Sequence, residues 1–225
     1  MTNTLHRYGS ADSFRDDYVV FAICCRGMND KDSVPKLRRF LEMALPFKPV
    51  NLGDSRHGGA FRASTSMHPT SHWNRDIQPD FLTVINGLNT MTTAAAVFDN
   101  RVAAEDFLKS VKEADLGLSV NISTSIEGAE QCCHEANACR HSVGYSLGFE
   151  GHTEHLPNED VLKLSTMCGH GMVSASFAKK MVDWVKEGRR TPEQAATYMT
   201  RFCSCGVFNP ARATRILEEA RIRQK

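Results

Sequence analysis

The sequence predicts an α/β protein: a mainly parallel sheet with helices on both faces, followed by C-terminal helices. Apolar runs of β-forming residues alternate with segments of helical periodicity, as in βαβ units. The run at residues 18–24 is apolar throughout, which is typical of a strand covered on both faces. A length of 225 residues suits one sizeable α/β domain and is short for two. Residues 1–225 are therefore expected to form a single domain.

The first strand–helix unit is expected over residues 17–52. Residues 18–24 form its strand, and Asp32 or Ser33 then begins an amphipathic helix. A short second strand follows at residues 49–52.

Residues 53–80 have no periodicity of either kind. A loop this long inside a domain is usually either a functional lid or disordered, so it is equally a candidate cover for a substrate and a candidate mobile connector. Its arginines Arg56 and Arg62 suit an anionic substrate, although solvated surface arginines are the common alternative.

Further strand–helix units are expected over residues 81–190, and helices alone after them. Thr191 to Gln194 form a capping box with proline at the first helical position, and Asn209 can cap the last helix within residues 191–225. The strands predicted in the middle of the chain are residues 81–86, 118–122 and 161–167, and the helices there begin near Met91, Asn100, Ile126 and Met172.

Composition gives no reason to expect a nucleic-acid or membrane partner. The net charge is +1, and no apolar run approaches the roughly 20 residues that span a bilayer. Residues 1–17 are polar and lack the apolar segment of a signal peptide, which favours the cytoplasm. Eight cysteines in a cytoplasmic chain favour metal binding or thiol chemistry over disulfides.

Four polar segments directly follow predicted strands. In open parallel sheets, ligands bind beyond the carboxyl ends of the strands, so these segments should meet at one edge. Asn86, Ser123 and Ser125 are therefore expected to bind substrate together with Arg56 and Arg62. The four segments are Cys24-Cys25, Asn86-Gly87, Ser123 to Ser125, and Cys168 to Gly171.

The segment Cys168-Gly169-His170-Gly171 is the most distinctive of them. Its glycines allow a tight turn, and a helix is expected to begin directly after it. The positive end of that helix should lower the pKa of the Cys168 thiol. Cys168 is thus a candidate catalytic thiol or metal ligand, and His170 a candidate general acid or base. A glycine turn with a packed cysteine is the structural alternative.

Cysteine spacing limits the possible metal ligands. Cys132 and Cys139 lie about 10 Å apart along one predicted helix, too far for one small centre with Zn–S bonds of about 2.3 Å. One of Cys132 and Cys133, nearer the helix start, should instead join Cys168 and the Cys203-x-Cys205 pair. The predicted metal ligands are Cys132, Cys133, Cys168, Cys203 and Cys205.

The motif Met167-Cys168-Gly169-His170-Gly171 resembles the first catalytic-cysteine motif of the proline racemase and epimerase family. In that family, a cysteine at a helix N-terminus is one of two acid–base thiols. The resemblance covers five residues and the following helix. The family's partner motif, an aspartate and a proline shortly before Cys-Gly-Thr-Gly, is absent, and the chain is too short for the duplicated fold. The resemblance therefore implies local convergence on one way of activating a thiol.

These observations predict a cytoplasmic metalloenzyme, a lyase, isomerase or oxidoreductase, that acts on a small anionic substrate. An iron–sulfur cluster is slightly preferred to zinc because sulfur outnumbers histidine among the converging residues. An iron with an open position would supply Lewis-acid chemistry. No dinucleotide fingerprint or phosphate loop is present in the sequence, and a homo-oligomer is possible.

Two alternatives stay open. The first is a metal-free thiol enzyme of the isomerase or lyase type, with Cys168 as base or nucleophile and a second thiol facing it across the substrate. The second is a non-catalytic carrier or maturation protein that holds a metal or cofactor for a partner.

Overall fold

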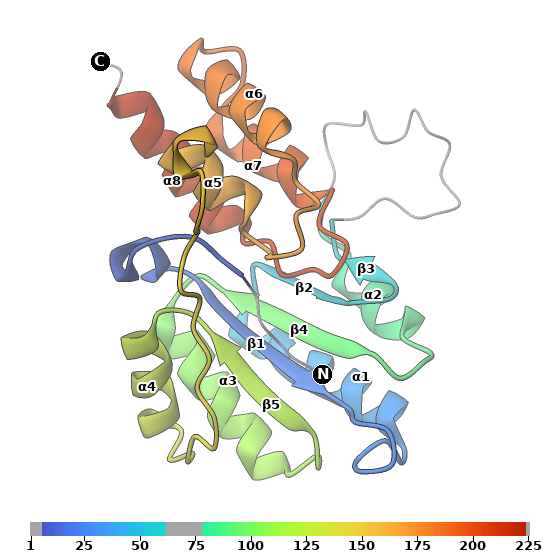
Figure 1. Cartoon of the computed structure of the whole chain (residues 1–225). Helices are drawn as coiled ribbons and strands as arrows, with labels where there is room; N and C mark the ends of the chain where they lie inside the picture. Colours follow the sequence, from blue (N-terminus) through green and yellow to red (C-terminus); the bar gives the residue numbers. More distant parts are fainter. Residues whose placement is uncertain (1–5, 62–77, 224–225) are drawn as a thin grey trace.

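The computed structural model describes residues 6–61 and 78–223, which form one sheet between two layers of helices (Figure 1). The strand order is β3-β2-β4-β1-β5, and every neighbouring pair is antiparallel. The described residues thus form an α/β protein with a five-stranded antiparallel sheet and eight α-helices. The strands are β1 (Tyr18–Ile23), β2 (Asn51–Asp54), β3 (Gly58–Gly59), β4 (Thr93–Phe98) and β5 (Ser119–Ser123).

The prediction of a mainly parallel sheet is wrong. Helix α1 (Ser33–Ala44) connects β1 to β2, and α3 (Arg101–Ala114) connects β4 to β5. Strands β1 and β2 run parallel with β4 between them, and strands β4 and β5 run parallel with β1 between them. This is the βαββαβ order of ferredoxin-like folds, in which all neighbours are antiparallel. An alternation of strands and helices does not reveal whether a crossover skips a strand.

The antiparallel order separates segments that were expected to meet at one edge. Strands β1 and β5 run in opposite directions, with Ile23 opposite Ser119 and Val19 opposite Ser123. Cys24 therefore lies at one end of this strand pair and Ser123 at the other, five residues or about 16 Å away along the strands at 3.3 Å per residue.

Three predicted elements have the opposite secondary structure. Residues 81–86 form helix α2 (Phe81–Gly87) and residues 161–167 largely form helix α5 (Glu159–Ser165), whereas the helix expected from Met91 is strand β4. Short apolar runs fit either periodicity, and here the caps decide: Asp80 and Asn158 accept hydrogen bonds from backbone N–H groups of α2 and α5. The alanines of β4 favour a helix, but their small side chains suit a central strand covered on both faces.

Helices α3, α4, α7 and α8 begin where the sequence predicts, because their caps are local, whereas α6 begins at Ala175 instead of Met172. Asn100, Ser125 and Asn209 each accept a hydrogen bond from a backbone N–H in the first turn of α3, α4 and α8. Thr191 and Gln194 form the predicted capping box of α7. Helix α4 is shorter than expected and ends before Cys139. The remaining bounds are α4 (Ile126–Glu135), α6 (Ala175–Lys186), α7 (Pro192–Thr200) and α8 (Pro210–Ile222), with 3-10 helices at Ala11–Phe14 (η1), Leu45–Phe47 (η2) and Thr153–His155 (η4).

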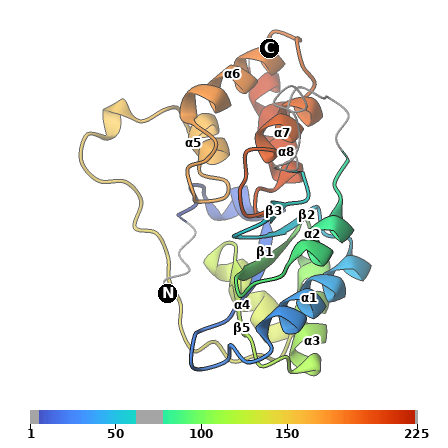
Figure 2. The same ribbon diagram turned by 90° about the vertical axis from the view of Figure 1, so that its right-hand side faces the viewer.

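Two hydrophobic cores lie on opposite faces of the sheet (Figures 1 and 2). Along β1, Val19, Phe21 and Ile23 face helices α5 to α8, while Val20 and alternate neighbours face α1 and α3. The C-terminal helices gather on one side of the sheet in both views. Within the described ranges, no helix combines the length and apolarity needed to cross a membrane.

Candidate functional site

Two loops between the C-terminal helices bring three thiols and one imidazole together. Cys168 and His170 come from the α5–α6 loop, and Cys203 and Cys205 from the α7–α8 loop. The Sγ atoms of Cys203 and Cys205 are 3.6 Å apart, and Cys205 Sγ lies 3.2 Å from His170 Nδ1. The Cys168 thiol interacts with both other thiols. We call Cys168, His170, Cys203 and Cys205 the thiol–imidazole cluster.

The α7–α8 loop rests directly on the β2–β3 hairpin through three glycines. A Cβ atom at Gly53 would lie 2.8 Å from the carbonyl oxygen of Cys205, and one at Gly59 would lie 2.5 Å from Gly206 Cα. Gly206 has a φ of +72° and would place its own Cβ 2.5 Å from Gly53 Cα. Only glycines allow this backbone contact, which sets the position of the two cysteines on the sheet.

Hydrogen bonds hold the end of the same loop. The buried Asn51 side chain donates from Nδ2 to the carbonyl oxygen of Phe208, at 2.9 Å. The backbone N–H of Phe208 in turn donates to Cys203 Sγ, at 3.3 Å. The sulfur of Cys203 therefore receives a donor from the backbone as well as from neighbouring thiols.

The α5–α6 loop places its two donors at different depths. Gly169 and Gly171 have φ values of 74° and 68°, so the backbone is left-handed on both sides of His170. As a result Cys168 is fully buried, whereas His170 lies at the surface. Helix α6 is capped by Ser174, well after Cys168, which instead follows the C-terminal end of α5. Cys168 therefore lacks the helix N-terminus expected from the sequence.

Hydrogen bonds among the three thiols shift their pKa values in different directions. Hydrogen bonding with Cys203 raises the pKa of Cys168 to about 11, the reverse of the predicted direction. The thiols of Cys168 and Cys205 hold the pKa of Cys203 well below its ordinary value. Interaction with Cys168 also raises the pKa of Cys205. These hydrogen bonds therefore favour the thiolate at Cys203 over the thiolate at Cys168 or Cys205.

A buried charge network connects both loops to the N-terminal segment. The Asp17 carboxylate is fully buried between two guanidinium groups, accepting from Arg212 Nη1 at 2.8 Å and pairing with Arg7. Arg7 also donates from Nε to the carbonyl oxygen of Met167, at 3.0 Å, and lies near enough to Cys168 to interact with it electrostatically. The network therefore adds a positive charge beside the cluster and fixes the residue before Cys168.

The other predicted metal ligands lie elsewhere. Cys132 is fully buried in the core on the other face of the sheet, where burial raises its pKa to about 12. Cys133 is its neighbour on α4, and Cys24 belongs to the same core as Cys132. The structure thus brings together Cys168, Cys203 and Cys205 without a third segment from α4.

The predicted substrate-binding residues are dispersed. Arg56 is exposed in the β2–β3 turn, and Asn86 is exposed on α2, where its carbonyl oxygen accepts from Arg38. Ser123 and Ser125 line a surface cavity of about 950 Å³ at the start of α4, on the far edge of the sheet. Arg62, with most of the expected lid, lies outside the described residues.

Two groups of polar side chains were not identified from the sequence. The first is a fixed histidine: buried Asp54 accepts from the backbone N–H groups of Arg56 and His57 and contacts His57 Nδ1 at 3.0 Å. His57 Nε2 lies 3.1 Å from Asn89 Oδ1. The available signal was an aspartate three residues before a histidine, directly after a strand.

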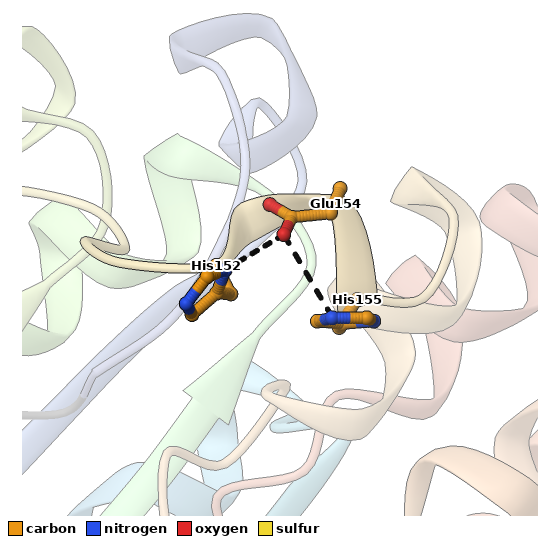
Figure 3. Close-up of side chains that lie close together, drawn as sticks. All are labelled: His152, Glu154 and His155. Carbon is orange, nitrogen blue, oxygen red and sulfur yellow. Dashed lines mark hydrogen bonds and ion pairs between the residues drawn. The ribbon is translucent and has the colours of Figure 1, made fainter.

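The second group is formed by His152, Glu154 and His155 around η4 (Figure 3). One donor atom from each side chain lies within 4.8 Å of the other two, and all three residues are exposed. The pKa of Glu154 is lowered by a hydrogen bond from its own backbone N–H and by His152. The available signal was the short H-x-E-H spacing at residues 152–155.

No protein-family model, curated protein sequence or solved structure matches the chain. The ferredoxin-like strand order does not indicate a function either, since one fold carries many unrelated sites. A function must therefore be argued from the chemistry of the cluster.

Proposed function

We propose that the thiol–imidazole cluster binds one transition-metal ion, with zinc the best fit, and that the protein is a metalloenzyme at this site. The observation that carries the proposal is the close approach of the donors, 3.6 Å between Cys203 Sγ and Cys205 Sγ and 3.2 Å between Cys205 Sγ and His170 Nδ1. Three thiolates and one imidazole form a common tetrahedral zinc ligand set.

The two distances agree with the edges of a single-ion site. Zn–S bonds of about 2.3 Å and Zn–N bonds of about 2.0 Å place tetrahedral donors about 3.5–3.8 Å apart. In an iron–sulfur cluster the protein thiolates bind separate irons and so lie further from one another. The 3.6 Å between Cys203 Sγ and Cys205 Sγ supports a single ion over the iron–sulfur cluster that composition alone suggested. No three donors of the cluster lie within 4.8 Å of one another, so the two loops would have to close around the ion to complete its ligand set.

Burial and charge support the same assignment. Cys168, Cys203 and Cys205 are 0%, 1% and 6% exposed, so ionising all three at this depth would require a bound cation. A divalent ion with a neutral imidazole leaves one net negative charge, which the nearby guanidinium of Arg7 offsets.

The exposed donor of the cluster is the side from which a substrate could reach a bound ion. Of the four donors only His170 is exposed, so a small anionic substrate would approach on its side. A bound zinc ion would activate water or polarise an oxygen, which favours a lyase or hydrolytic reaction, and the exposed His170 would act as general acid or base. We assign the protein to the cytoplasm, where thiols stay reduced.

Metal analysis of protein purified without oxygen tests the proposal. We expect one zinc per chain, which Cys203→Ala should lose and Cys132→Ala, at an equally buried cysteine in the other core, should keep. Iron with acid-labile sulfide would refute the single-ion site in favour of a cluster. Active protein without metal would favour a thiol enzyme, in which Cys203 and Cys205 are near enough to form a disulfide after a small movement.

A further inference from the structure

We propose that His152, Glu154 and His155 form a second, exchangeable site for a divalent transition-metal ion, separate from the thiol–imidazole cluster. The three side chains project from one short turn, and the carboxylate lies between the two imidazole rings (Figure 3). The proposal does not depend on the function assigned to the cysteines.

The donors are already near ligand spacing. Glu154 Oε1 lies 2.8 Å from His152 Nδ1 and 3.7 Å from His155 Nε2. An ion bound at 2.0–2.2 Å places its donors about 3.0–3.5 Å apart. Small side-chain rotations would therefore bring all three onto one ion.

The backbone holds the two histidines on the same side. His152 is the N-cap of η4 and His155 its last residue, and the backbone N–H of His155 donates to the carbonyl oxygen of His152, at 3.2 Å. The two imidazole centroids are 5.9 Å apart. The turn is entered through Gly151, which has a φ of 90° and accepts from the backbone N–H of Thr153 at 2.9 Å. The donor arrangement thus follows from local backbone geometry.

The chemistry of the group indicates the ligand. Two imidazoles and one carboxylate suit zinc, nickel, copper or cobalt better than magnesium or calcium, which prefer oxygen alone. The side chains of His152, Glu154 and His155 are 86%, 63% and 81% exposed, and their ion pairs in the structure are with one another. The ion would keep open positions for water or a donor from another molecule, so binding would be labile.

Zinc titration by calorimetry, on protein purified with its cysteine site as isolated, tests the proposal. We expect the wild-type chain to bind one more zinc ion than His152→Ala/His155→Ala, and Glu154→Gln to bind that ion more weakly. His134→Ala is the matched control: His134 is also exposed and paired with a glutamate, but without a third donor, and it should leave the stoichiometry unchanged.

The titration separates failure of the second metal site from failure of the cysteine site. If the cluster binds no zinc, the wild-type chain still binds one ion and the double variant none. Equal stoichiometry in the wild type and the double variant would overturn the second site. Because all three residues are exposed in a loop, circular dichroism should show the same fold in every variant.

Discussion

Gly206 holds the cysteine loop against the β2–β3 hairpin, so Gly206→Ala should force the two apart. The added Cβ would lie 2.5 Å from Gly53 Cα, Gly53 N and the carbonyl carbon of Leu52, which are backbone atoms that cannot rotate away. Gly188 provides the matched control. Its φ of +71° is nearly the same as the +72° of Gly206, but no atom of the described residues lies within 4 Å of its Cβ position.

The two substitutions separate backbone strain from steric contact. A side chain in the left-handed region costs about 1–2 kcal/mol, and this applies to both positions. Overpacking adds about 1–3 kcal/mol at Gly206 alone. We therefore expect the free energy of unfolding to fall by about 1 kcal/mol in Gly188→Ala and by about 3 kcal/mol in Gly206→Ala.

Equilibrium urea denaturation of both variants, after removal of metal with a chelator, measures the difference. A gap of about 2 kcal/mol corresponds to about 4–8 °C in melting temperature for a domain of this size. Gly206→Ala should also weaken zinc binding, whereas Gly188→Ala should not. Equal losses of stability in the two variants, within about 0.5 kcal/mol, would refute the close contact between loop and hairpin.

Three further predictions concern charge, capping and protons. Asp17→Asn leaves two buried guanidinium groups without their carboxylate, so it should lower the free energy of unfolding in urea by about 3–5 kcal/mol. Asp12→Asn removes one partner of an exposed ion pair and should change this free energy little. Equal losses in the two variants would mean that burial of the pair is unimportant. Thr191→Ala should cost about 1 kcal/mol in thermal unfolding through loss of the capping box, and an unchanged melting temperature would contradict it. The pKa values of Cys168 and Cys205 are raised, and zinc binds the thiolate form, so zinc binding at pH 8 should release about two protons, measured with an indicator dye. Zinc affinity should also rise with pH. If no protons were released, both thiols would already be ionised.

Local signals in the sequence predicted local structure well. The caps at Asn100, Ser125, Thr191 and Asn209 lie where expected because each depends on one side chain and the next turn of backbone. The run at residues 18–24 was recognisable as a buried strand because it is apolar on both faces.

Strand direction was not predictable in the same way. It depends on which strands become neighbours, and β4 lies between β1 and β2 although it follows both in the chain. The short runs at residues 81–86 and 161–167 have no periodicity that separates strand from helix, so their caps and packing decide.

Cys168, His170, Cys203 and Cys205 lie near one another for a reason other than the one expected from the sequence. From the sequence, they were expected to meet because parallel strands end at one edge of a sheet. In the structure, α5 to α8 pack on one face of the sheet, and two of their connecting loops lie near the β2–β3 hairpin. Each loop carries two donors at a spacing of i and i+2, next to a glycine with positive φ. That spacing keeps the two donors of a loop close in the chain whether a strand or a helix precedes it, and in the α7–α8 loop the two Sγ atoms are 3.6 Å apart. By contrast, a ligand from α4 depended entirely on the tertiary arrangement, and the sheet separates Cys132 from the cluster. Short donor pairs in glycine turns are therefore the part of such a site that a sequence can carry by itself.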